Sequence, residues 1–216
     1  MSGSRECVLA AVRGALGPPR DPAAIAAEAR ALLGSPELLR STLPNRSLTD
    51  VFCERIAAPK VGATVERAAS LRDFPGAVRR YLDAHHLPAV VALQPAADLR
   101  ELDWSGMVLH AKMASDECAG VGMARWGIAE TASLVFHSGP DTPVLFNFLP
   151  RYSIIALRAR NLVAYLEDYA TLAAQAGPPP RNVNLITGAS GTTDIEGSYV
   201  RGAHGPGSLH VVVIED

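Results

Sequence analysis

Residues 185–196 read Leu-Ile-Thr-Gly-Ala-Ser-Gly-Thr-Thr-Asp-Ile-Glu, an apolar run followed at once by glycine and hydroxyl residues. An apolar run that is followed by glycine and hydroxyl residues is typical of a buried strand that ends in a loop. Glycines let backbone N–H groups converge on one point, and hydroxyls add further donors, so this loop can hold a phosphate or a carboxylate. The stretch therefore predicts an anion site at a strand end.

The chain from residue 61 onward indicates the fold class. Short β-branched runs alternate with helical patterns, which predicts an α/β fold with a parallel-rich, doubly wound sheet. The expected strands lie at 61–65, 89–93, 107–111, 120–123, 133–137, 153–157, 183–187 and 209–214, and the expected helices at 70–85 and 161–175. The long polar connection between the last two strands is the kind of segment that usually carries function in a compact domain.

Residues 1–60 are interpreted as an N-terminal helical segment that precedes an α/β domain at 61–216. Apolar residues recur at helical spacing on both sides of the Gly-Pro-Pro sequence at 17–19, and Ser47 is placed to cap a further helix over 48–57. No cluster of reactive side chains stands out in this segment, so we expect it to act as a scaffold or a lid.

Composition and charge exclude several classes of protein. The 216 residues include 20 Lys plus Arg and 22 Asp plus Glu, and a net charge of -2 offers no long-range attraction for nucleic-acid phosphates. No apolar run approaches the ~20 residues of a membrane span. Cys7, Cys53 and Cys118 are too far apart to form a metal or iron–sulfur motif. We expect one main domain in the cytoplasm, with no membrane span, no metal site and no nucleic-acid partner.

The glycine and hydroxyl loop matches neither common phosphate-binding motif. It lacks the lysine of a P-loop, and no Gly-x-Gly-x-x-Gly with a suitably spaced acidic residue occurs. The alternative is a tight strand-to-helix turn in which Thr192 or Asp194 only caps a short helix.

Four titratable residues lie in the glycine and hydroxyl loop or in segments that precede strands. Asp194 and Glu196 would share a face in extended backbone and could act as acid and base, or could form a solvated acidic turn. His204 lies between glycines before the last strand, where it is either a titrating group of a cleft or an ordinary polar residue. Glu130 precedes an apolar strand and is either a catalytic or ligand-holding carboxylate or a helix cap.

Three motifs together resemble the LUD domain of lactate utilization proteins, specifically the protein C branch. They are Gly-Ile-Ala-Glu-Thr at 127–131, the stretch 185–196, and Gly-Ala-His-Gly-Pro at 202–206. The resemblance implies a fold similar to that of sugar-phosphate isomerases and coenzyme A transferases. The family pattern has Gly-Thr after its Glu-Thr, where this chain has Ala132-Ser133. It has Gly-Pro-Ser in the strand-end loop with Ala before the Asp, where this chain has Ala189 and Thr193.

The resemblance also implies a function and a set of site residues. The family takes part in oxidising L-lactate to pyruvate with iron–sulfur partners, here the lactate utilization proteins A and B, and iron–sulfur clusters are expected only on those partners. The implied catalytic residues are Glu130, Asp194 and His204. The residues implied to bind a small carboxylate or phosphate are Thr131, Thr187, Gly188, Ser190, Thr192, Glu196, Gly205 and Pro206.

Two other functions stay open at this point. The chain could be a stand-alone isomerase- or coenzyme A transferase-like enzyme, with Glu130 as nucleophile and Arg151 and Arg201 as the nearest basic residues in sequence. It could also be a non-catalytic assembly subunit that docks a partner through the aromatic segment 146–150.

Overall fold

The computed structural model describes residues 2–38, 40–194 and 197–216, and the chain divides into two compact units, 1–41 and 42–216. The smaller unit contains α1 (Ser2–Leu16), α2 (Pro22–Leu33) and the 3-10 turn η1 (Pro36–Leu38). Asp21 begins α2 by accepting a hydrogen bond from the Ala23 N–H (3.0 Å). The helices expected on either side of residues 17–19 are therefore present.

The larger unit, 42–216, contains the remaining elements. Its helices are α3 (Leu48–Ile56), α4 (Phe74–Ala84), α5 (Ala97–Arg100) and α6 (Leu166–Gln175), with 3-10 turns η2 (Leu71–Asp73), η3 (Val144–Asn147) and η4 (Ala159–Asn161). Its strands are β1 (Ala63–Ala68), β2 (Val90–Leu93), β3 (Val108–His110), β4 (Ala119–Met123), β5 (Trp126–Ile128), β6 (Ser133–His137), β7 (Tyr152–Arg158), β8 (Leu162–Val163), β9 (Val183–Ile186), β10 (Gly191–Thr192), β11 (Val200–Arg201) and β12 (Ser208–Ile214).

Six strands form one parallel sheet, in the order β1-β12-β7-β4-β2-β3. This confirms the α/β class with a parallel sheet. A second sheet, in the order β8-β5-β6-β9, contains two antiparallel pairs and one parallel pair. The expected strands at 133–137 and 183–187 form an antiparallel pair of this second sheet, because an apolar run shows that a strand is buried but not which sheet it joins.

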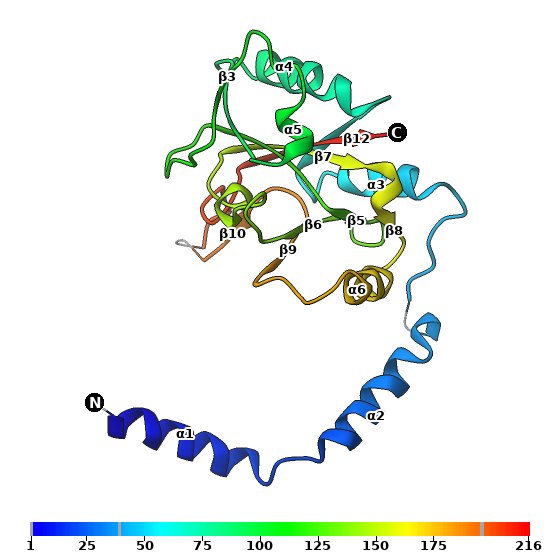
Figure 1. Ribbon diagram of the computed structural model, residues 1–216, viewed down its shortest axis with the longest axis vertical. Coiled ribbons are helices and arrows are strands. Elements are labelled where there is room, and N and C mark those ends of the chain that lie inside the picture. Colours follow the sequence, from blue (N-terminus) through cyan, green and yellow to red (C-terminus); the bar gives the residue numbers. More distant parts are fainter. Residues whose placement is uncertain (1, 39, 195–196) are drawn as a thin grey trace. The chain divides into compact units, whose positions relative to one another are not determined.

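The elements stack in layers because successive side chains of a strand face opposite sides. In β7, Ile154 and Ala156 pack in a buried cluster with α4, whereas Ile155 and Leu157 pack with α3 and the smaller sheet. The other face of the smaller sheet packs on α6 through Tyr169. Figure 1 shows α4 and α6 on opposite sides of the two sheets. Both faces of the large sheet are buried, which leaves its two edges, where strands begin and end, for ligands.

Three expectations about local structure are corrected. The helix expected at 161–175 begins only at Leu166, because Leu162 and Val163 form β8 beside β5. Residues 126–128, which are not among the expected strands, form β5, whose short length gives little sequence signal. The helix expected at 70–85 is divided into η2 and α4, after a capping box at Ser70.

The helix expected at 48–57 is confirmed as α3 and belongs to the larger unit. Ser47 accepts a hydrogen bond from the Asp50 N–H (3.1 Å) and caps it, while Phe52 and Ile56 are fully buried. In the described ranges, no helix is long and apolar enough to cross a membrane.

Candidate functional site

The glycine and hydroxyl loop follows β9 and is fixed by its main chain. Gly188 has a φ of +82°, and a Cβ at this position would lie 2.0 Å from the carbonyl oxygen of Val61. The next residue, Ala189, donates its N–H to the same carbonyl (3.2 Å). Only glycine accommodates both the left-handed conformation and the close approach, so the loop is attached to the segment that leads into β1.

The His204 loop is held against this loop by backbone hydrogen bonds. Ser190 donates its N–H to the carbonyl of Pro206 (2.8 Å), and Gly202 donates its N–H to the carbonyl of Ser190 (3.0 Å). A Cβ on Gly205 would lie 3.2 Å from that of Ser190. The two loops predicted from sequence are therefore in contact, and Ser190, Gly205 and Pro206 lie together.

The Glu130 turn joins the same region through hydroxyl groups. Ser133 is buried, and its hydroxyl forms hydrogen bonds with the hydroxyls of Thr131 (2.7 Å) and Thr187. Glu130 contributes two main-chain hydrogen bonds. Its N–H donates to the Ala164 carbonyl (3.0 Å), and its carbonyl accepts a hydrogen bond from the Arg55 guanidinium. The predicted residues Thr131 and Thr187 are thus brought together across the smaller sheet.

Ala132, in the same turn, has a φ of +54° and is 1% exposed. A left-handed conformation favours glycine, which is the residue that the resembling family pattern has at this position. The departure from that pattern therefore costs backbone strain and adds one buried methyl group.

Thr192 and Asp194 lie on a small hairpin beyond the loop. Thr192 pairs with Val200 between β10 and β11, and its hydroxyl accepts a hydrogen bond from the Asp194 N–H (3.3 Å). Asp194 is exposed. Glu196, also predicted as a ligand-binding residue, lies outside the described residues.

A cleft of about 800 Å³ opens beside His204, and we call it the His204 cleft. It lies where Tyr152 and Ser208 begin β7 and β12, at the amino edge of the large sheet. Its lining residues are Ser115, Asp116, Glu117, Phe148, Leu149, Arg151, Tyr152, Arg201, Gly202, Ala203, His204, Gly205, Gly207 and Ser208. Among the predicted site residues that the structure describes, His204 and Gly205 line this cleft.

The polar groups of the cleft include two guanidinium groups. Arg201 donates a long hydrogen bond to the Gly62 carbonyl (3.4 Å), and the Arg151 side chain has no hydrogen-bond or ion-pair partner in the described ranges. Glu117 is 8% exposed, accepts from the Ala114 N–H (3.4 Å) and lies 3.5 Å from the His110 ring. The Glu117 carboxylate has the Ala114 N–H and the His110 ring as its partners and does not pair with Arg151. Arg151 is therefore available for an anion.

Two buried rings, those of Tyr81 and His210, lie behind Tyr152 and Ser208. The two rings stack, with centroids 4.4 Å apart. Burial raises the pKa of Tyr81, with the neighbouring Tyr152 acting in the same direction and Ser208 against it. Burial also lowers the pKa of His210, whose Nδ1 is bonded to the Thr64 hydroxyl (2.7 Å).

Other charged groups near His210 modify that pKa. The Glu66 carboxylate, 3.9 Å from Nε2, opposes the effect of burial, whereas His85 and Arg80 add to it. Burial therefore favours the neutral forms of the Tyr81 and His210 side chains behind the cleft.

Sequence reasoning missed Glu117, Tyr152 and Ser208, which stand just before or at the start of strands. Phe146, offered as a docking residue, is buried, whereas Phe148 is exposed and lines the cleft. Across the described residues, no three His, Cys, Asp or Glu side chains gather in a way that could hold a metal ion.

A parallel sheet with glycine loops and a cleft that contains two arginines at one edge defines an α/β protein with sites suited to small ligands. The comparisons with known proteins give the family. Residues 112–214 match the model of the LUD domain, so this part of the chain is a LUD domain.

Several relatives share this region. YkgG of Escherichia coli K12 is 37% identical over 101 residues, and the lactate utilization protein C of Exiguobacterium is 30% identical over 101 residues. Each alignment covers 45% of this chain and 44% of the relative, so the chain spans less than half the length of these two. The lactate utilization protein C of Deinococcus radiodurans is 23% identical over 197 residues, which cover 80% of this chain and 92% of the relative.

A solved structure supports the fold. The crystal structure of a DUF162 family protein from Deinococcus radiodurans matches with a TM-score of 0.55 and 19% sequence identity, over 80% of this chain and 99% of that chain. At this identity the likeness establishes the fold alone.

Proposed function

We propose that this chain is a component of L-lactate utilization in the cytoplasm and binds a small carboxylate, lactate or pyruvate, in the His204 cleft. The process is supported by the LUD domain and by the relatives named lactate utilization protein C. The chemistry is supported by one observation: Arg151, whose side chain has no partner among the described residues, lines the same cleft as the glycine loop that carries His204.

In this proposal Arg151 binds the carboxylate with two parallel N–H donors, a geometry that suits guanidinium and carboxylate groups. Arg201 adds a second positive charge on the same cleft. His204 is exposed and lies on a loop between glycines, so its ring can approach the hydroxyl of lactate and accept its proton.

Oxidation of L-lactate to pyruvate removes two electrons and two protons. His204 can take the hydroxyl proton, but a side chain of this kind cannot take the electrons. We therefore propose that the electrons and the second proton leave through iron–sulfur partners, the lactate utilization proteins A and B. The cleft is larger than lactate requires, which leaves room for an acceptor group beside the substrate.

Calorimetric titration of the purified chain with L-lactate and pyruvate tests the binding. We expect Arg151→Gln to weaken binding about tenfold or more, because a charge-assisted pair is lost. Arg181→Gln removes an equal charge from an exposed position outside the cleft and should leave the dissociation constant unchanged. The titration is repeated in the presence of proteins A and B. The proposal is wrong if neither ligand binds in either setting, or if both variants weaken binding equally.

A further inference from the structure

The carboxyl edge of the large sheet has a topological switch point. β2 and β4 are neighbours, but the chain leaves them in opposite directions, from β2 outward to β3 and from β4 the other way to β7. In open α/β sheets, ligands bind in the crevice beyond the carboxyl ends of two such strands. The crevice expected here lies between Gln94 and Ala124, the residues that follow β2 and β4.

A cavity of about 330 Å³ occupies this position, and we call it the arginine crevice. Its lining residues are Gln94, Ala96, Asp98, Met123, Ala124, Arg125, Phe136, His137, Thr142, Arg158, Arg160 and Asn161. Three of them are arginines and one is an aspartate, so the lining carries an excess of two positive formal charges. Burial, helped by the charge of Arg125, lowers the pKa of His137 and keeps its ring neutral near pH 7.

Two of the arginines are available to a ligand. In the described part of the chain, neither Arg125 nor Arg160 has a carboxylate partner. The Arg125 guanidinium lies 4.5 Å from the centre of the Trp126 ring. The backbone carbonyl of Arg125 accepts a hydrogen bond from the side-chain amide of Asn161 (3.0 Å). Stacking on an aromatic ring orients a guanidinium while its N–H donors stay available for an anion.

The floor between the strands is also fixed. Gln94 is 3% exposed, accepts from the Met123 N–H (2.7 Å) and donates to the Asp141 carbonyl (3.0 Å). A Cβ on Gly122 would lie 2.6 Å from the Gln94 oxygen, so a glycine in β4 makes room for this amide. The crevice is thus a formed site on two strand ends, not a gap between mobile loops.

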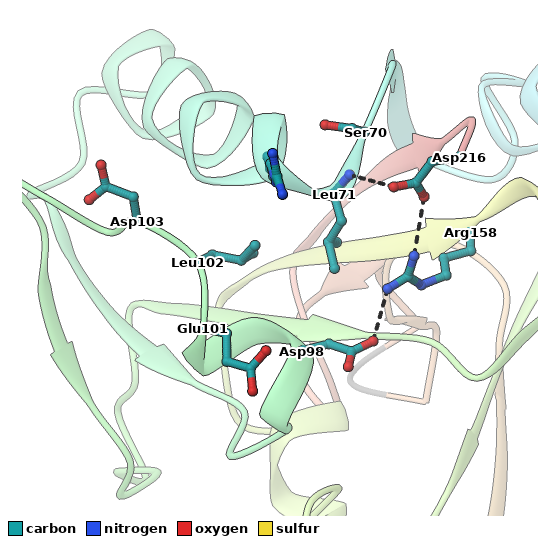
Figure 2. A pocket seen from close by; sticks show the side chains of 9 residues that line it. Ser70, Leu71, Asp98, Glu101, Leu102, Asp103, Arg158 and Asp216 are labelled. Carbon is teal, nitrogen blue, oxygen red and sulfur yellow. Dashed lines mark hydrogen bonds and ion pairs between the residues drawn. The ribbon is translucent and has the colours of Figure 1, made fainter.

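The opposite charge lies on the other side of Arg158. Figure 2 shows Arg158 between Asp98 (2.9 Å) and Asp216 (3.2 Å), at the border of a second cavity of about 750 Å³. Glu101 and Asp103 also line that cavity, where four carboxylates face two arginines. A ligand that carried negative charge past Arg158 would meet these carboxylates, so the anionic part must be compact.

We propose that the arginine crevice binds the phosphate group of a small phosphate monoester, with Arg125 and Arg160 as its principal ligands. A phosphate monoester carries about -1.5 to -2 charges at neutral pH, which matches the charge excess of the lining. Arg158, held by two carboxylates, positions the boundary of the site, and the acidic cavity excludes polyphosphates.

Titration calorimetry of the full chain with ribose 5-phosphate, inorganic phosphate and adenosine triphosphate tests the site. We expect Arg125→Gln and Arg160→Gln to weaken binding of ribose 5-phosphate and of phosphate about tenfold or more. Arg125→Lys should give an intermediate loss, because lysine keeps the charge but not the planar fork. Adenosine triphosphate should bind more weakly than ribose 5-phosphate.

Two variants serve as controls. Arg72→Gln makes the same charge change at the same edge, on the acidic side of Arg158, and should alter the dissociation constant less than about twofold. Arg151 lies in the His204 cleft. If Arg151→Gln leaves the affinity for ribose 5-phosphate unchanged, the crevice is separate from the proposed lactate site. The inference is overturned if ribose 5-phosphate and phosphate fail to saturate the chain, if Arg72→Gln or Arg151→Gln costs as much as Arg125→Gln, or if adenosine triphosphate binds more tightly.

Discussion

The two edges of the large sheet carry the two proposed anion sites, which are built in different ways. At the amino edge, glycine loops hold one another through backbone hydrogen bonds, as between Ser190 and Pro206. At the carboxyl edge, the crevice consists of arginine side chains on the rigid ends of β4 and β7. A site made of main chain depends on backbone conformation, whereas a site made of side chains depends on charge. Substitutions of the loop glycines at the first edge should therefore affect chiefly stability, whereas substitutions of Arg125 and Arg160 at the second should affect chiefly ligand affinity.

The largest effect is expected at Gly188. Gly188→Ala should lower the free energy of unfolding by about 2–4 kcal/mol, since a Cβ would collide with the Val61 carbonyl in a left-handed conformation. Gly197→Ala is the matched control, because Gly197 has a φ of +69° and open space around its Cβ position. It should cost only about 1 kcal/mol. Urea unfolding measures both, and equal costs would show that the loop is not held against Val61.

A smaller effect is expected at Arg158, in the carboxyl edge. Arg158→Gln should lower the free energy of unfolding by about 1 kcal/mol in low salt and by less in 1 M salt, because both carboxylate partners are partly exposed. Arg46→Gln removes one partner of an exposed pair with Glu54 and should cost less. Thermal unfolding at the two salt concentrations measures this. A larger, salt-independent loss would mean that Arg158 acts through packing.

The smallest expected effect concerns pH. The pKa values of His210, near the amino edge, and His137, in the crevice, are both lowered from 6.5, chiefly by burial. When the pH falls, the unfolded chain binds these protons first. Their contribution to stability is therefore present above pH 6.5 and is lost as the pH falls through the folded-state pKa values.

The free energy of unfolding should thus decrease between pH 7 and 5, and the decrease should be smaller in His210→Gln and in His137→Gln. Urea titrations at each pH measure the slope. An unchanged slope in both variants would assign the acid sensitivity to other groups.

The amino-edge loops were predictable from sequence, and the crevice was not. The loop after β9 combines glycines and hydroxyls in one short run, so local composition marks it. Arg125 follows β4, whereas Arg158 and Arg160 lie at or just after the end of β7, and each looks like an ordinary surface charge in the sequence. Only the strand order of the folded sheet brings them to one cavity.

The fold class followed from alternation, but the division into two sheets did not. Strand β6 is as apolar as a strand of the large sheet, and pairing partners are decided by tertiary packing. Likewise, Glu130 was predicted for its carboxylate, whereas its carbonyl and N–H make the contacts that tie the turn to Arg55 and Ala164.

The stacking of Arg125 on Trp126 also gives the molecule an optical signal. The chain has two tryptophans, and the other, Trp104, is buried on the far side of the large sheet with its indole N–H bonded to the Leu99 carbonyl. Trp104 emission should stay constant when a ligand arrives. An anion that draws the Arg125 guanidinium away from the Trp126 ring should change the remaining fluorescence, so occupancy of the crevice can be followed in the unlabelled protein.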